Sequence, residues 1–150
     1  MNYLDELPGR YHLERMVDDY GNEKTTTMIG TCVIKDLGDG QLAYREDVKI
    51  EGDRMAFREF TYKLDGSKLH VEFADNHRDG EYVCLDFSEN PVAMADHHCG
   101  DDIYAHEMAF LSAKNWSTRV SVRGPEKHMV IRTTYYRAKD DEQLDDAQAT

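Results

Sequence analysis

The sequence predicts an all-β fold, an antiparallel meander of about ten strands closed into a barrel. Short runs of alternating apolar and polar residues recur along the chain, and Gly, Asp or Asn ends most of them. Such runs are typical of half-buried antiparallel strands joined by tight turns. A meander of roughly eight to ten strands removes its free edges by closing into a barrel, which at this size encloses a small-ligand cavity. A two-sheet sandwich is the alternative.

The predicted strands follow one another with short connections. With the turn residues that end them, they are 9–23, 25–40, 41–53, 54–66, 68–80, 81–90, 92–99, 102–113, 116–124 and 129–138. No long segment has a helical period, although the first residues, MNYLDEL, are compatible with a short helix. We expect a single barrel domain over 1–138. Residues 139–150 are acidic, lack aromatic residues and are predicted to be disordered.

Charge and cysteine usage exclude several classes of partner. The 150 residues carry a net charge of −12, which argues against nucleic acids and anionic membranes because both require a basic surface. No window approaches the roughly 18 apolar residues of a transmembrane helix. The cysteines, Cys32, Cys84 and Cys99, are odd in number, and no charged-then-apolar leader precedes them. We therefore expect a cytoplasmic protein with a small-molecule ligand, and a homodimer is left open.

Charged residues interrupt the apolar faces of several predicted strands. These residues are Arg15, Glu46, Arg58 and Arg137. A buried arginine is costly unless it is paired with an acid or bound to an anion. In one interpretation Glu46, with Asp102, neutralises the arginines in a filled interior. In the other, one arginine is left over and binds a carboxylate or phosphate, while tyrosines hold the rest of the ligand.

The stretch ADHHCGDDIY, residues 95–104, concentrates reactive side chains around one predicted turn. His97 and Cys99 share a face before the turn, and Asp102, Tyr104 and His106 share a face after it. A zinc site built on His97, Cys99 and His106 lacks the usual ligand number and spacing, so no metal site is predicted. A Cys–His nucleophile pair is conceivable, but the spacing does not define its hydrogen-bond geometry.

Five short motifs in fixed order resemble an uncharacterised bacterial family of small lipocalin-like barrels, a domain of unknown function. They are Tyr44 with Glu46; Ala56, Arg58 and Phe60; His97, Cys99, Gly100, Asp102 and Tyr104; Gly124, Pro125 and Lys127; and Tyr135 with Arg137. The resemblance covers about Gly9 to Arg137 and implies a calycin-type barrel with a polar interior. The chain departs from the pattern at Tyr11, where the family has tryptophan, and at His128 and Met129, where an acid and an aromatic residue are expected.

The first functional hypothesis is a protein that binds a small, partly apolar anion, such as a fatty acid, an aromatic acid or a tetrapyrrole, inside the barrel. The candidate ligand-binding residues are Tyr44, Glu46, Arg58, Phe60, Tyr62, His97, Cys99, Asp102, Tyr104, Lys127, Tyr135 and Arg137. Arg58 and Arg137 are expected to hold the negative group. Lys127, beside a Gly-Pro turn, is placed at the barrel mouth, where it meets the ligand or only solvent.

Two further hypotheses use the same barrel. An isomerase, lyase or hydrolase would use His97 with Asp102 as an acid–base pair, Tyr104 as a proton donor and Arg58 as an oxyanion stabiliser. Haem binding would need His97, His106 or Cys99 as an axial ligand, and the sequence selects none of them. A packing module without a cavity is the remaining possibility. The sequence identifies no cofactor.

Overall fold

The computed structural model describes residues 3–74, 81–112 and 114–139. Its elements are the 3-10 helix η1 (Tyr3–Glu6) and the strands β1 (Gly9–Asp19), β2 (Lys24–Gly38), β3 (Gln41–Lys49), β4 (Met55–Asp65), β5 (Lys68–Phe73), β6 (Glu81–Asp86), β7 (Val92–Cys99), β8 (Asp102–Phe110), β9 (Asn115–Arg123) and β10 (His128–Arg137). The predicted tail, 139–150, lies outside the described residues except for Lys139.

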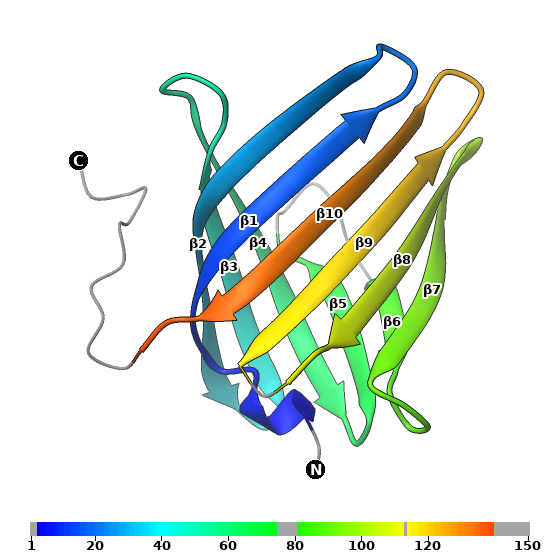
Figure 1. Cartoon of the computed structure of the whole chain (residues 1–150). Helices are drawn as coiled ribbons and strands as arrows, with labels where there is room; N and C mark the ends of the chain where they lie inside the picture. Colours follow the sequence, from blue (N-terminus) through cyan, green and yellow to red (C-terminus); the bar gives the residue numbers. More distant parts are fainter. Residues whose placement is uncertain (1–2, 75–80, 113, 140–150) are drawn as a thin grey trace.

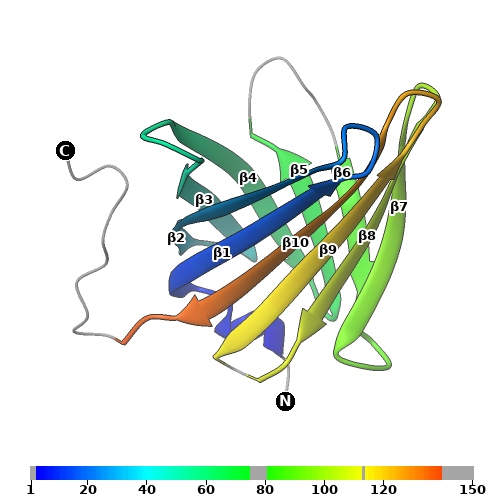
Figure 2. The same ribbon diagram turned by 45° about the horizontal axis from the view of Figure 1, so that its top comes forward.

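All ten strands form one antiparallel sheet in the order β6-β5-β4-β3-β2-β1-β10-β9-β8-β7. Strands that are consecutive in the chain pair with each other, except β6 and β7, and β1 also pairs with β10. The sheet curls until its edge strands, β6 and β7, lie side by side (Figures 1 and 2). These strands meet without a backbone ladder among the described residues, so the barrel is nearly closed. The predicted meander and barrel are confirmed.

Ring contacts bridge the seam between β6 and β7. The ring of Tyr82 on β6 lies 5.0 Å from that of His97 on β7 and 4.6 Å from that of His106 on β8, both in edge-to-face geometry. Edge-to-face pairs at such distances are favourable for aromatic rings. Packing of side chains therefore holds β6 and β7 together, whereas backbone hydrogen bonds hold neighbouring strands together elsewhere in the sheet.

The two ends of the barrel differ. Helix η1 covers one end, where Leu4 and Leu7 are each 1% exposed (Figure 1). The turns that follow β1, β3, β7 and β9 lie at the other end, which we call the mouth (Figure 1). Within the described residues, no helix is both long enough and apolar enough to cross a membrane.

Side chains alternate across the sheet as the sequence predicts. On β3, for example, Leu42, Tyr44, Glu46 and Val48 are each at most 3% exposed, while the residues between them are more accessible. Period-two alternation sends these four side chains into the barrel. The charged residues that interrupt the apolar faces are therefore interior residues, which makes their pairing the central question about the site.

Gly30 on β2 lies very close to the backbone of β3. A Cβ atom at this position would stand 2.0 Å from the main-chain oxygen of Asp47 and 2.8 Å from the Cα of Val48. Real Cβ atoms do not approach backbone so closely, so only glycine fits this position. Glycine inside a strand often marks such a close approach of another backbone.

We predict that Gly30→Ala lowers the free energy of unfolding by about 1–3 kcal/mol, because β2 and β3 must separate to admit the methyl group. Urea denaturation followed by circular dichroism measures the change. Gly21→Ala is the matched control, since its nearest neighbour would be the Asp19 carboxylate at 3.4 Å. Equal denaturation midpoints for the two variants would contradict this account of β2.

Candidate functional site

A buried ion pair between Arg15 and Glu46 lies at the centre of the barrel. The two guanidinium NH groups of Arg15 donate to the Glu46 carboxylate at 2.5 and 2.9 Å, and Arg15 Nε donates to Thr133 Oγ1 at 2.8 Å. Arg15 is 8% exposed, and Glu46 and Thr133 are each 2% exposed. The pair joins β1, β3 and β10, and its two parallel hydrogen bonds have the strong bidentate geometry.

Two tyrosines and a second arginine extend this cluster. Tyr44 OH lies 2.6 Å from Glu46 Oε1, and Tyr135 OH lies 2.7 Å from Tyr44 OH. Because an ionised carboxylate only accepts hydrogen bonds, Tyr44 donates to Glu46 and Tyr135 donates to Tyr44. Arg58, which is the register partner of Glu46 on β4, donates to Glu46 Oε1 at 3.3 Å.

The cluster holds its charges at neutral pH. Burial alone would raise the pKa of Glu46, but the hydrogen bonds and charge of Arg15 and the charge of Arg58 lower it to about 2. Burial works against the charge of both arginines, yet Glu46 raises the pKa of each above its ordinary value. Two cations and one anion leave a single excess positive charge in this cluster.

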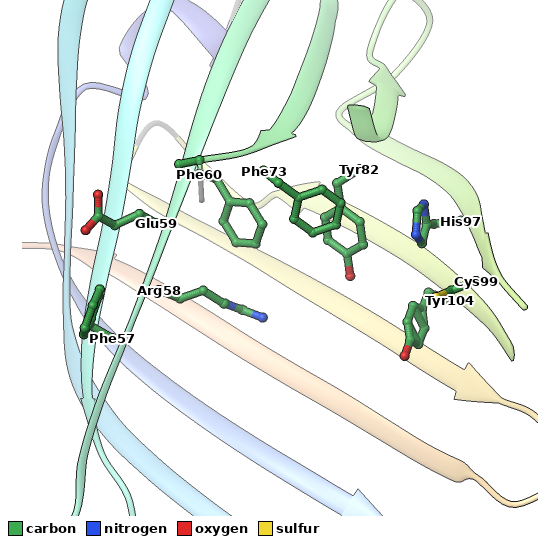
Figure 3. A pocket seen from close by; sticks show the side chains of 10 residues that line it. Phe57, Arg58, Glu59, Phe60, Phe73, Tyr82, His97, Cys99 and Tyr104 are labelled. Atoms are coloured by element: carbon green, nitrogen blue, oxygen red, sulfur yellow. The ribbon is translucent and has the colours of Figure 1, made fainter. Parts of the chain in front are cut away.

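Arg58 carries the part of this charge that is available to a ligand. Protein surrounds its guanidinium, yet 51% of the side-chain surface is accessible because it faces a cavity (Figure 3). The guanidinium lies 5.2 Å above the ring of Phe60. It makes one hydrogen bond to the described residues, to Glu46, and so keeps most of its five N–H donors for another partner.

The cavity has a volume of about 720 Å³, which is within the usual range for small-molecule sites. Its lining residues are Phe57, Arg58, Glu59, Phe60, Phe73, Ala74, Tyr82, His97, Cys99 and Tyr104. Arg58 points into the space between the strands, whereas Phe57 and Glu59 point away on the other face of β4 (Figure 3). Aromatic rings therefore form most of the inner surface around one guanidinium.

Four rings of the cavity form two nearly perpendicular sets, and the fifth, Phe73, is tilted by 39° from Tyr82. Phe60 and Tyr82 are stacked with an interplanar angle of 4° and a centroid distance of 5.7 Å. His97 and Tyr104, which are register partners on β7 and β8, are stacked at 17° and 6.0 Å. The sets meet where Tyr82 contacts His97 at an angle of 71°. Together they form a corner lined with rings.

An ion pair lies at the barrel mouth. Lys127 Nζ is 3.3 Å from Asp102 Oδ2, and this contact raises the pKa of Lys127. The Gly124 amide donates to the carbonyl of Lys127 at 3.0 Å, which closes the Gly-Pro turn and brings Lys127 over Asp102. A Cβ atom on Gly124 would lie 1.8 Å from Asp102 Oδ1, so glycine leaves the space that this carboxylate occupies.

Arg137 lies at the covered end of the barrel and is absent from the cavity lining. Its guanidinium donates to the carbonyl of Glu6, to that of Pro8 at 3.1 Å and to Tyr11 OH at 2.8 Å. It also stacks 5.0 Å above the Tyr11 ring. These contacts fasten the segment after η1 to β1 and β10, so Arg58 and Arg137 do not face the same cavity.

His106 is a buried histidine behind Tyr82. It is 9% exposed, and its Nε2 has no hydrogen-bond partner in the described part of the chain. Burial, together with the nearby His97 and the positive charge of Arg58, lowers its pKa to about 4. The imidazole is therefore neutral near pH 7. No group of three His, Cys, Asp or Glu side chains in the described residues is arranged to hold a metal ion.

The structure divides the predicted site residues among four places. The cavity lining contains Arg58, Phe60, His97, Cys99 and Tyr104. The buried cluster contains Tyr44, Glu46 and Tyr135, with Tyr62 stacked on Tyr44 at 5.1 Å. The mouth holds Asp102 and Lys127, and the covered end holds Arg137. Asp102 thus pairs with Lys127, and no hydrogen bond joins it to His97 among the described residues.

Two cavity rings, Phe73 and Tyr82, were missing from the predicted set. Phe73 alternates with the buried Leu69 and Val71 on β5, which is a signal that the sequence does contain. Tyr82 is different, because it follows a register shift between β5 and β6 at Val71/Glu72. The extra residue of a β-bulge changes which side chains face inward, so simple alternation assigns Tyr82 to the wrong face.

We predict that Glu46→Leu lowers the free energy of unfolding by about 3–5 kcal/mol, because it leaves the Arg15 charge buried and unpaired. The double variant Arg15→Leu/Glu46→Leu is expected to lose clearly less than the sum of the two single changes. Urea denaturation of all four proteins gives the coupling energy. Additive effects would contradict a direct Arg15–Glu46 interaction.

The low pKa of His106 leads us to predict a loss of stability in mild acid. Above pH 6.5 the imidazole is neutral in both states, whereas between about pH 6.5 and 4 only the unfolded chain binds the proton. The free energy of unfolding should therefore fall by roughly 3 kcal/mol over this interval. His106→Leu should flatten the fall, measured by urea denaturation across the interval. The exposed His98→Gln is the control, and a wild-type slope in His106→Leu would refute this assignment.

Solved structures with a similar barrel are distant from this chain in sequence. The S-type phycobiliprotein lyase CPES from Guillardia theta has a TM-score of 0.73 and 6% identity, over 93% of this chain and 92% of that one. A protein with unknown function from the DUF3598 family of Nostoc punctiforme has a TM-score of 0.63 and 13% identity, over 90% of this chain and 49% of that one. A redesigned β-barrel, mFAP0, bound to DFHBI, has a TM-score of 0.51 and 13% identity, over 88% and 99%.

These similarities confirm the predicted lipocalin-like barrel, and at such low identity they establish the fold alone. A comparison with curated proteins finds no match. The model of a family of unknown function, DUF6314, matches residues 7–137, which is most of the chain and agrees with the predicted range. The chain therefore belongs to the family of unknown function DUF6314.

Proposed function

We propose that this protein binds a small, partly apolar ligand with one negative charge in the open cavity, and that Arg58 holds the negative group. The observation that carries this proposal is the guanidinium of Arg58. It faces the cavity, keeps most of its donors free and belongs to a cluster with one excess positive charge. An anion in the cavity would neutralise that charge and use the free donors.

In this proposal Arg15 has a structural role and Arg58 binds the ligand. Arg15 is saturated by Glu46 and Thr133, so it organises the interior and has little left for a ligand. Arg58 makes a longer contact with the same carboxylate, at 3.3 Å, and is accessible. A planar guanidinium held on one side by an acid presents its other N–H groups in a fixed direction, which suits a carboxylate.

The remaining predicted residues would contact the ligand, position Arg58 or stabilise the barrel, depending on where they lie. Phe60, His97, Cys99 and Tyr104 would contact the ligand because they line the cavity. The buried cluster next to the cavity would fix the position of Arg58; its predicted members are Tyr44, Glu46, Tyr62 and Tyr135. Asp102 and Lys127 would shape the mouth, and Arg137 would stabilise the covered end.

Two further observations support a ligand-binding role. One barrel of similar fold is bound to DFHBI and another is a phycobiliprotein lyase, so this architecture accommodates small-molecule functions. The cavity volume and its mainly aromatic lining are those of a ligand site. Cys32, Cys84 and Cys99 form no disulfide with one another, which is consistent with the cytoplasm as the compartment that we propose.

Binding is favoured over catalysis by the placement of Asp102. The enzyme hypothesis needs Asp102 to orient His97, yet the carboxylate is paired with Lys127 at the mouth. His97 instead contacts the rings of Phe73, Tyr82 and Tyr104. An imidazole among rings is well placed to pack against a ligand, whereas a general base needs an orienting partner.

The test uses two fluorescent probes that differ by one charged group, 8-anilino-1-naphthalenesulfonate and neutral N-phenyl-1-naphthylamine. We predict that Arg58→Gln weakens binding of the sulfonate at least about tenfold relative to the neutral probe, because a charge-assisted contact of about 1.5–3 kcal/mol is lost. Fluorescence titration gives both Kd values.

Arg119→Gln is the matched control, because Arg119 is an exposed arginine on β9 and lies away from the cavity lining. An unchanged ratio of the two affinities in Arg58→Gln would refute Arg58 as the anion-binding group. An absorbance band of haem in the purified protein, lost in His97→Ala, would instead support the haem alternative.

A further inference from the structure

We infer that the ligand of this cavity is a planar aromatic monoanion, with its acidic group on Arg58 and its ring system in the corner between Tyr82 and His97. This inference rests on the proposed function and adds the class of ligand to it. It excludes flexible fatty acids and rigid saturated acids as preferred ligands. Three features of the cavity carry it: the chemistry of the walls, the directions of the ring planes and the number of charges.

The cavity walls are aromatic and hardly aliphatic. The rings of Phe60, Phe73, Tyr82, His97 and Tyr104 line it (Figure 3), and Ala74 is the one aliphatic side chain among the described lining residues. The leucines and valines of the chain pack in the core instead, as Leu69 and Val83 do. An acyl chain would gain burial here but no specific interaction, whereas an aromatic ligand gains both.

The ring planes fix an orientation that only a flat, conjugated ligand can use. The planes of Phe60 and Tyr82 are parallel to within 4°, those of His97 and Tyr104 to within 17°, and the two sets meet at 71°. A planar ring system that stacks on one set is therefore edge-on to the other. Offset stacking and edge-to-face contact are the two favoured geometries of aromatic pairs. A saturated skeleton has no quadrupole to align with either set.

The charges of the cavity fit one acidic group. The buried cluster has a single excess positive charge, and Arg58 is the member that faces the cavity. Lys127, the cation at the mouth, is already paired with Asp102 at 3.3 Å. A second negative group on the ligand would find no unpaired cation among the described cavity residues and would lie near the Asp102 carboxylate. The site therefore suits a monoanion.

The experiment compares three monocarboxylates with the same number of carbon atoms: 1-naphthoate, 1-adamantanecarboxylate and undecanoate. Isothermal titration calorimetry with the full-length protein measures each Kd. We expect 1-naphthoate to bind at least about tenfold more tightly than the other two, because it alone interacts with both ring sets. Phe60→Leu and Tyr104→Leu, one from each ring set, should each reduce this preference severalfold, and Tyr136→Leu, on the outer face of β10, should leave it unchanged.

The outcomes separate this inference from the proposed function. Binding of all three acids that depends on Arg58, with either saturated acid as tight as 1-naphthoate, would overturn the aromatic preference and leave the anion site standing. A preference for 1-naphthoate that survives both leucine variants would also overturn it, since the rings would then not be its cause. If no acid binds while neutral N-phenyl-1-naphthylamine does, the proposed function fails as well.

Discussion

The architecture of the barrel interior depends on the ion pair between Arg15 and Glu46. A charge in a protein interior is tolerated only when its partner and its remaining hydrogen bonds are all present. Here Thr133 and Tyr44 complete the set, so a single polar cluster joins three strands, β1, β3 and β10. The same carboxylate then has a contact left for Arg58, and this contact turns a structural feature into a candidate binding site.

Most of the fold could be predicted from the sequence because alternation and turn residues act locally. The ten strands coincide with the period-two runs, and Gly, Asp or Asn residues mark most of the turns between them. The interior position of Arg15, Glu46 and Arg58 followed from alternation alone. The candidate site could be predicted only in part, since cavity membership depends on curvature and register across the whole sheet. Arg137 has the right face but lies at the covered end, and Tyr82 faces inward only because of a bulge.

Short motifs acquired structural explanations that no single strand could supply. Gly124 and Lys127 belong to one turn, and Asp102 comes from a different hairpin, yet the three form one unit at the mouth. The glycine leaves room for the carboxylate, and the turn carries the lysine to it. The enzyme hypothesis paired Asp102 with His97 because a carboxylate can orient an imidazole. The turn between β9 and β10 lies beside the start of β8, and this proximity decided the pairing instead.

The seam between β6 and β7 has a consequence for the size of the interior. A barrel with a continuous ladder has a diameter fixed by its number of strands and their stagger, and widening it would break backbone hydrogen bonds. In this barrel the circumference is completed by the rings of Tyr82, His97 and His106. The contacts of these rings therefore hold the circumference at the one place in the described barrel where no backbone ladder does. A substitution in Tyr82 would loosen the closure of the barrel without breaking any strand pairing.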